Sequence, residues 1–165
     1  MTRDEVKAVL GYFEWSGEHT YRDLTACLVD TAFRFDEMLS LQSSNIDLNG
    51  NKIHLYDSKN GKPRFVPMTK RVREIMSIRK ALGLFSSVKY LSYMDSWKRM
   101  IKHVGFDEDV VLHTPRHTTA SHLVQAGIHL QVVKEVLGHT SIQTTLRYAH
   151  LAPSNIETGI EALEA

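Results

Sequence analysis

The chain has 165 residues, and its 20 basic and 19 acidic side chains leave a formal net charge of +1. This length is enough for one domain with an ordinary core, while the near-neutral charge excludes a uniformly basic nucleic-acid binder, although a basic face can be offset by an acidic one. No apolar run is long enough to cross a membrane, and Cys27, the single cysteine, excludes a disulfide framework. We therefore expect a soluble cytoplasmic protein in which Cys27 is a buried thiol.

Apolar residues recur at helical spacing through the first 41 positions. The pattern predicts helices over residues 3–15, 22–32 and 35–41, and Gly17 ends the first of them. Arg34 falls at the break between the second and third helices. We expect its side chain to reach a part of the surface that residues within a helix could not reach.

The only strand-like pattern lies between residues 46 and 66. Residues 46–48 and 52–56 are predicted to form a hairpin, with Asn49 and Gly50 supplying the positive φ angles of a tight turn. A second turn over 57–63 leads into a strand at 64–66 and carries Lys59 at its tip. The sequence thus predicts a small three-stranded antiparallel sheet at one edge of a mainly α domain.

Basic side chains dominate the segment 52–73, where Asp57 is the one acid. The basic residues are Lys52, Lys59, Lys62, Arg64, Lys70, Arg71 and Arg73. This asymmetry predicts a local basic surface, from which Lys62, Arg64, Lys70 and Arg71 are candidate DNA contacts. On charge alone, an ordinary solvated surface is an equally good interpretation.

Two further helices precede the C-terminal part of the chain. Residues 69–82 carry the apolar stripe Val72, Ile75, Met76 and Leu82, and Gly83 is the stop signal. Residues 94–104 form the next predicted helix, which ends at Gly105. Its Trp and Met positions are most simply core.

Three short helices are predicted between residues 114 and 149. Thr114 suits an N-cap with Pro115 at the first helical position, and this helix runs to Ala126. The second covers 130–137, the third begins at Ser141, and a terminal helix follows Pro153 with a capping box at Ser154. The terminal helix has an apolar stripe, which needs a partner surface on its own domain or on a neighbouring protomer.

Four chemically capable side chains lie at the ends and turns of these three helices, where they can converge on one point. They are His113, Arg116, His139 and Tyr148. Arginines can bind the oxygens of a phosphodiester and stabilise its transition state, and a tyrosine hydroxyl can attack its phosphorus. A loop-tip lysine could protonate the leaving oxygen, and no metal is needed because side chains supply the charge. Taken one at a time, each residue has an ordinary structural interpretation.

The ordered segments TAFRFDEMLSL, SKNGKPRFVPM, HTPRHTTASHLVQAG and LGHTSIQTTLRYAHLAP resemble the catalytic domain of the tyrosine recombinases, also called the phage integrase family. The resemblance implies phosphate-binding arginines, a lysine that protonates the leaving 5′ oxygen, two histidines, and a tyrosine that forms a 3′-phosphotyrosyl link. Residue by residue these are Arg34 and Arg116, Lys59, His113 and His139, and Tyr148. Glu37 supports the site, and His117 is expected to orient Arg116. No cofactor and no metal are implied.

The chain departs from the family pattern at a few positions that carry no catalytic group. Pro115 replaces the usual leucine, Ala32 the usual glycine, and Asp36 a frequent serine. The resemblance implies that residues 1–165 form the catalytic domain, with 153–165 as a tail helix. The N-terminal core-binding and arm-binding domains of the family are expected to be absent from this chain.

We therefore expect a site-specific DNA recombinase of the phage-integrase type that assembles as a tetramer on paired double-stranded sites. It would be a monomer or dimer when free, and would act at the nucleoid of a bacterial host. The alternatives are a type IB topoisomerase-like enzyme, a DNA-binding module that does not cut, and a metallohydrolase using His113 and His117. The last lacks the intervening glutamate of the zinc-protease helix motif.

Overall fold

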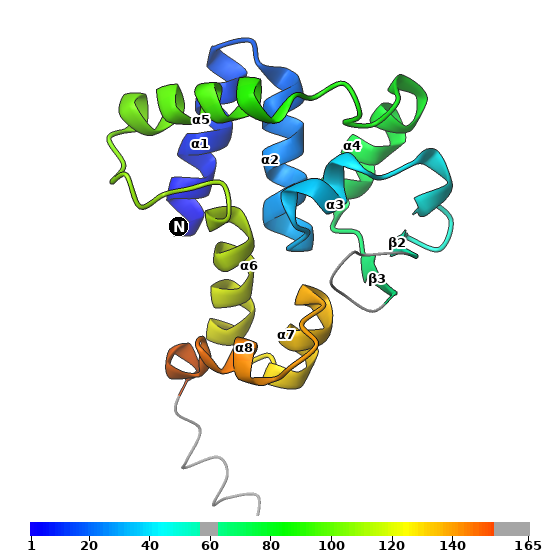
Figure 1. Ribbon diagram of the computed structural model, residues 1–165, viewed down its shortest axis with the longest axis vertical. Helices are drawn as coiled ribbons and strands as arrows, with labels where there is room; N and C mark the ends of the chain where they lie inside the picture. The colour runs from blue at the N-terminus through cyan, green and yellow to red at the C-terminus, as the bar shows by residue number, and fades with distance from the viewer. Residues whose placement is uncertain (57–62, 154–165) are drawn as a thin grey trace, which may run out of the picture.

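The computed structural model describes residues 1–56 and 63–153 (Figure 1). In chain order its helices and strands are α1 (Arg3–Trp15), α2 (His19–Thr31), α3 (Phe35–Leu39), β1 (Ile46–Asp47), β2 (Lys52–Leu55), β3 (Arg64–Pro67), α4 (Lys70–Arg79), α5 (Tyr90–Val104), α6 (Thr114–Gln125), α7 (Leu130–Leu137) and α8 (Gln143–Leu146). Short 3-10 turns cover Ser43–Asn45, Lys80–Leu82 and Ala149–Leu151. The predicted class, mainly α with a small antiparallel sheet, is confirmed.

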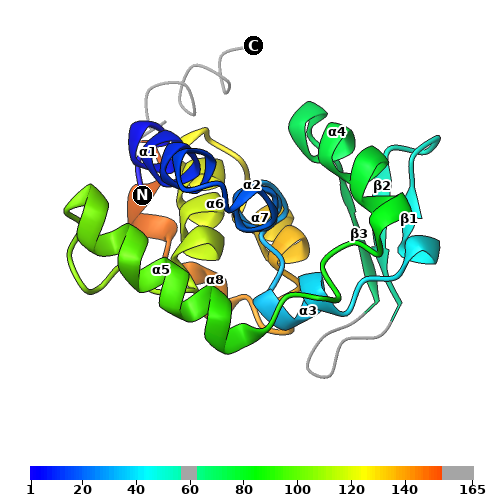
Figure 2. The ribbon, with the colours of Figure 1, turned by 90° about the horizontal axis from the view of Figure 1, so that it is seen from above.

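Helix α2 is the central element of the larger part of the fold. It packs against α1, α4 and α6, and α5 crosses beside α1 (Figures 1 and 2). The core around it is rich in aromatic side chains, and Tyr93 is fully buried where its hydroxyl lies 2.7 Å from the Thr25 hydroxyl. Cys27 is buried in this core, as expected.

The sheet has the strand order β1-β2-β3 and is antiparallel throughout. Its first turn differs from the prediction, because only Asn51 has a positive φ (54°) and Gly50 does not. Gly50 instead lies against Asp47, whose carboxylate accepts its backbone N–H at 2.8 Å. A Cβ at Gly50 would stand 2.2 Å from Asp47 Oδ2, so a larger residue here would force the Asp47 carboxylate to move.

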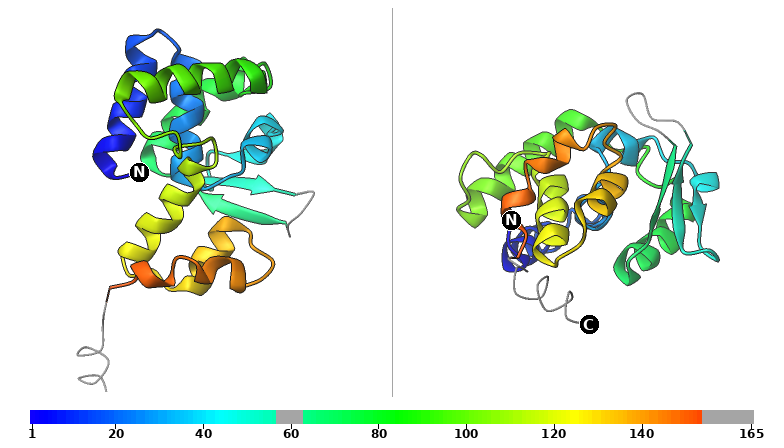
Figure 3. Two further views of the ribbon diagram at one scale, coloured as in Figure 1. Left: turned by 60° about the vertical axis from the view of Figure 1, so that its left-hand side comes forward. Right: turned by 90° about the horizontal axis from the view of Figure 1, so that it is seen from below.

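A smaller apolar cluster holds the C-terminal helices together. It contains Ala120 and Val124 from α6, Val133 and Leu137 from α7, and Tyr148 beyond α8. Helix α6 contacts both α2 and α7, and thereby connects this cluster to the larger core (Figure 3).

The predicted helix positions need six corrections. Helix α2 begins at His19 instead of residue 22, and α5 begins at Tyr90 instead of residue 94. The third helix ends at Leu39, and α8 is a single turn, so Tyr148 lies between it and a 3-10 turn instead of in a continuous helix. His113 is the N-cap of α6, because the Thr114 hydroxyl accepts the Val111 N–H at 2.9 Å and does not cap the helix. Leu82 is 68% exposed, since α4 tightens into a 3-10 turn before Gly83. The predicted terminal helix after Pro153 lies outside the described residues.

Within residues 1–56 and 63–153, no helix combines the length and apolar character required to span a membrane.

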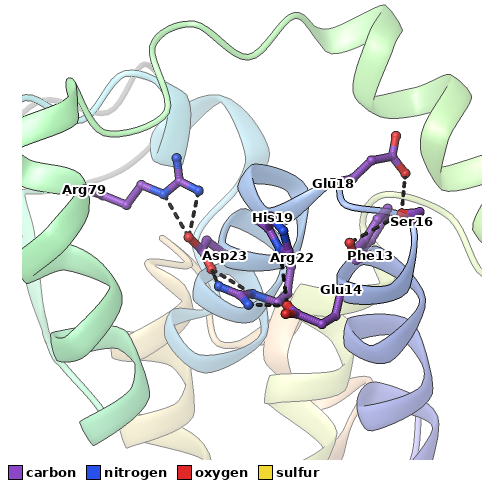
Figure 4. Close-up of polar contacts among 8 residues, drawn as sticks. All are labelled: Phe13, Glu14, Ser16, Glu18, His19, Arg22, Asp23 and Arg79. Atoms are coloured by element: carbon purple, nitrogen blue, oxygen red, sulfur yellow. Dashed lines mark hydrogen bonds and ion pairs between the residues drawn. The ribbon is translucent and has the colours of Figure 1, made fainter.

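An ion-pair network joins α1, α2 and α4 (Figure 4). The buried Asp23 carboxylate accepts Arg22 Nη2 at 2.6 Å and Arg79 Nε at 2.9 Å. Arg22 also pairs with Glu14 of α1. The Asp23 carboxylate of α2 therefore binds Arg79 of α4 and also Arg22, which itself reaches α1.

We expect Asp23→Asn to lower the free energy of unfolding by about 2–3 kcal/mol, because two guanidinium groups lose a buried counter-charge. Asp4→Asn is the matched control, since Asp4 pairs with Lys7 on the exposed surface of α1 and should contribute little. Urea unfolding of both variants measures the difference. Equal stabilities would contradict a structural role for the Asp23 network.

Candidate active site

The guanidinium of Arg116 is held at a junction of three helices. Arg116 lies in the first turn of α6, and its side chain donates from Nη1 to the Ala32 carbonyl and from Nη2 to the Leu137 carbonyl, both at 2.6 Å. These carbonyls stand at the C-terminal ends of α2 and α7, where backbone acceptors lack intrahelical partners and the helix dipole is negative. A cation is therefore well placed at this point.

Burial, followed by the neighbouring charges of Arg34 and Arg64, lowers the pKa of Arg116 to about 10, while Glu37 opposes the shift. The residue is only 8% exposed. At neutral pH it remains protonated, so the junction carries a fixed positive charge. The Arg116 guanidinium contacts the carbonyl of Ala32, so it lies against the segment that leads into Arg34.

Arg34 occupies the N-cap of α3, where Glu37 holds it in two ways. One Glu37 oxygen accepts the Arg34 backbone N–H and the other accepts Nη1, each at 2.8 Å. The Arg34 side chain is 33% exposed, so part of its guanidinium faces solvent. A phosphate could approach it there.

The Glu37 carboxylate stays ionised. Burial by itself raises its pKa, but hydrogen bonds from Arg64 and from the Arg34 backbone outweigh burial and leave the pKa below the ordinary 4.5. Glu37 therefore provides a negative charge among three arginines.

Arg64 does not belong to the exposed basic surface that its sequence neighbours predict. Its side chain is 8% exposed and donates to both Glu37 oxygens, at 2.8 and 3.2 Å. Its guanidinium also lies over the Phe33 ring, 5.3 Å from the centroid. Arg64 connects β3 to α3, which is a role that a surface pattern does not reveal.

The close approach of Gly138 completes the Arg64 environment. A Cβ at Gly138 would stand 2.6 Å from Arg64 Nη1, and Gly138 ends α7 with a φ of 65°. Both the positive φ and the lack of room for a Cβ beside Arg64 favour glycine at position 138. The turn that carries His139 is therefore packed directly against Arg64.

His139 is neutral at physiological pH. Burial and then the charges of Arg116, Arg34, Arg147 and Arg64 lower its pKa to about 4. Its Nδ1 is 2.9 Å from the Thr145 hydroxyl, which fixes the ring orientation. A neutral imidazole in this position can donate one hydrogen bond from Nε2 to an anion.

The Tyr148 hydroxyl is paired with His117. Tyr148 is 7% exposed, and its hydroxyl lies 2.5 Å from His117 Nδ1. Burial raises the pKa of Tyr148, although the charges of Arg147 and Arg116 oppose this shift. Burial also lowers the pKa of His117, and the charges of Arg147, His113 and Arg116 lower it further. His117 therefore contacts the tyrosine, whereas backbone carbonyls orient Arg116.

The remaining predicted site residues are placed as follows. His113 is exposed at the N-cap of α6 and borders a groove of about 930 Å³ between α5 and the segment before α6. Lys70 is exposed on α4, and Arg71 is paired with Asp30 at 2.5 Å. Lys59 and Lys62 lie outside the described residues.

The described part of the chain has no group of three or more His, Cys, Asp or Glu side chains that could hold a metal ion. Sequence reasoning missed the carbonyl anchors of Arg116, because no side-chain pattern marks a backbone acceptor. It also missed the contact between His117 and Tyr148, which depends on how α6 and α8 pack.

Comparisons with known proteins agree with this arrangement. Residues 1–155 match the phage integrase family. The chain is 30% identical over 163 residues to a tyrosine recombinase of Thermosipho africanus, covering 92% of the chain and 57% of that protein. It is 33% identical over 165 residues to an integrase of Escherichia phage 186, covering 98% of the chain and 46% of that protein. The chain belongs to the phage integrase family of tyrosine recombinases.

The comparison with solved structures shows a shared fold. A structure of the Tn1549 transposon integrase in complex with circular intermediate DNA matches with a TM-score of 0.82 at 17% identity, over 99% of this chain and 66% of that one. The chain spans about half the length of the curated relatives named above.

We expect Gly138→Ala to lower the free energy of unfolding by more than Gly105→Ala. Both glycines end helices at positive φ, 65° and 77°, so each alanine should cost about 1–2 kcal/mol for the backbone. Only at position 138 would the new methyl also displace Arg64, whereas no atom lies within 4 Å of the Cβ position at Gly105. Chemical unfolding measures both; equal losses would contradict the packing of Arg64 against this turn.

Proposed function

We propose that this chain is the strand-cleaving domain of a site-specific DNA recombinase of the phage-integrase type. In this proposal, Tyr148 forms a covalent 3′-phosphotyrosine link with double-stranded DNA and later releases it as the strands rejoin. The observation that carries the proposal is the shared position of a tyrosine hydroxyl, two arginines and neutral histidines at one helix junction. Family membership supports it.

The arrangement suits attack on a phosphodiester. Arg34 and Arg116 would bind the non-bridging oxygens and stabilise the additional charge of the transition state. The Tyr148 oxygen would form a bond to phosphorus while the bond to the 5′ oxygen breaks, and that oxygen takes a proton from Lys59, as the family resemblance implies. His139, and His113 from the rim, would donate hydrogen bonds to the phosphate.

A covalent intermediate also accounts for rejoining without an energy source. The phosphotyrosine keeps a phosphodiester-like bond, so a free 5′ hydroxyl can attack it in the reverse reaction. We propose that exchange between two DNA sites requires several copies of the protein, as a tetramer on paired sites. The setting proposed is integration of a phage or similar element in the cytoplasm of a bacterial host.

Two related functions fit less well. A type IB topoisomerase-like enzyme would use similar chemistry, but the relatives named above are recombinases and integrases. A module that only binds DNA would not need a buried tyrosine paired with a histidine. We retain strand cleavage and rejoining as the proposed activity.

Covalent trapping tests the proposal directly. Incubation with a pool of nicked duplexes in chelator should yield a detergent-stable protein–DNA adduct that Tyr148→Phe abolishes, because the phenol oxygen forms the link. Tyr21→Phe is the control, since Tyr21 packs beside Tyr93 in the main core. An adduct that persists in Tyr148→Phe, or one that requires a metal, would contradict the proposed chemistry.

Loss of Arg34 should slow adduct formation by about 10²–10³-fold, by analogy with loss of a hydrogen-bond donor to a developing anion. Arg34→Ala is the suitable variant because its side chain is partly exposed and its removal leaves the Arg64–Glu37 pair in place. Arg3→Ala, on the exposed start of α1, is the control. A rate for Arg34→Ala within about twofold of the control would remove Arg34 from the phosphate site.

A further inference from the structure

We propose that His117 is the general base of the cleavage step: its Nδ1 takes the proton of Tyr148 as the phenol oxygen attacks phosphorus. This inference rests on the proposed function and gives a catalytic role to a residue that was expected only to orient Arg116.

The geometry suits direct proton transfer. His117 Nδ1 and the Tyr148 hydroxyl are 2.5 Å apart, with no intervening group. His117 lies in the first half of α6, directly after the anchored Arg116, so its backbone is fixed by the helix and by the two carbonyl contacts of its neighbour. Acceptance at Nδ1 requires the tautomer that carries its proton on Nε2.

The surroundings of His117 and Tyr148 favour a neutral imidazole and a protonated phenol, which are the states that proton transfer requires. The groups that face His117 are Arg147 from the end of α8, His113 and Arg116 from α6, and Tyr148. With burial, the positive groups favour the neutral imidazole, which can accept a proton. Burial likewise keeps Tyr148 neutral, so its proton remains on oxygen until phosphate is in place.

Neither of the other two histidines is as well placed. His139 uses Nδ1 for Thr145, and its pKa of about 4 makes it a weak base. His113 is the N-cap of α6, and no contact joins it to Tyr148 among the described residues. His117 is the histidine whose ring nitrogen contacts the phenol.

The step balances without an added reagent. The oxygen–phosphorus bond forms as the phenol proton moves to Nδ1, and the bond to the 5′ oxygen breaks, with its electron pair staying on that oxygen. The general acid protonates this oxygen. During rejoining the 5′ hydroxyl attacks, its proton returns to the general acid, and protonated His117 returns its proton to Tyr148.

The test separates basicity from hydrogen bonding. His117→Asn places an amide oxygen near the position of Nδ1 but provides no base, and His117→Ala removes both. Each variant is prepared with Tyr148 and with 3,5-difluorotyrosine at position 148, which ionises at lower pH and needs a base less. Adduct formation is timed from pH 5 to 9, with His19→Asn as the control at an exposed histidine.

We expect both variants to slow adduct formation by about 10²–10⁴-fold, which is the usual contribution of a general base. Difluorotyrosine should restore much of this rate in the variants and change the parent rate little. The parent rate should fall as the pH drops below the ordinary histidine value of 6.5, because protonated His117 cannot accept. That acid limb should be absent from both variants.

Several outcomes would overturn the inference. A parental rate for His117→Asn would leave His117 with only a positioning role, and a failure of difluorotyrosine to rescue either variant would show that proton removal is not the missing step. Absence of any adduct from the parent protein would instead refute the proposed function. A normal parent adduct with fully active His117→Ala would refute the general base alone.

Discussion

The site depends on one buried cation held by backbone rather than by side chains. Arg116 donates to the last carbonyls of α2 and α7, so three helices from distant parts of the chain meet at its guanidinium. Two carbonyls satisfy part of its hydrogen-bonding capacity without neutralising its charge. A carboxylate partner would have cancelled that charge, whereas helix C-termini stabilise it and leave it available to an anion.

Glu37 is the carboxylate that pairs with the other two arginines, Arg34 and Arg64. Three guanidinium groups in one partly buried cluster repel one another, and a single carboxylate between Arg34 and Arg64 offsets part of that repulsion. The net charge of the cluster remains positive, which favours a phosphate. Burial is the main reason that the pKa of His139 and that of His117 are lowered, and Arg116 lowers both further. The Arg116 charge therefore helps to attract an anion and also helps to keep both histidines neutral.

Most of the fold was predictable because its signals are local. Helical spacing located α1 and α7 closely, and the strand-like pattern with its turn residues located the sheet strands. The glycines at 83, 105 and 138 all adopt positive φ at helix ends. The site was less predictable where it depends on packing between elements. Arg64 looked like a surface residue because its neighbours are basic, and only the approach of α3 and the Gly138 turn buries it. His117 adjoins Arg116 in sequence, yet its ring contacts Tyr148.

Ala32 shows that the backbone at the junction around Arg116 keeps its conformation even where that conformation is strained. It caps α2 in the left-handed region, with a φ of 55°, which costs a non-glycine residue about 1–2 kcal/mol. The family pattern usually has glycine at this position. The strained angle points the Ala32 carbonyl at Arg116, and the residue is fully buried between α2 and the C-terminal cluster. Its methyl group and the hydrogen bond from Arg116 offset the strain, so the chain keeps the backbone turn that glycine would allow more freely. The position of the Ala32 carbonyl, which must accept the hydrogen bond from Arg116, therefore determines the backbone conformation here, whether the residue is alanine or glycine.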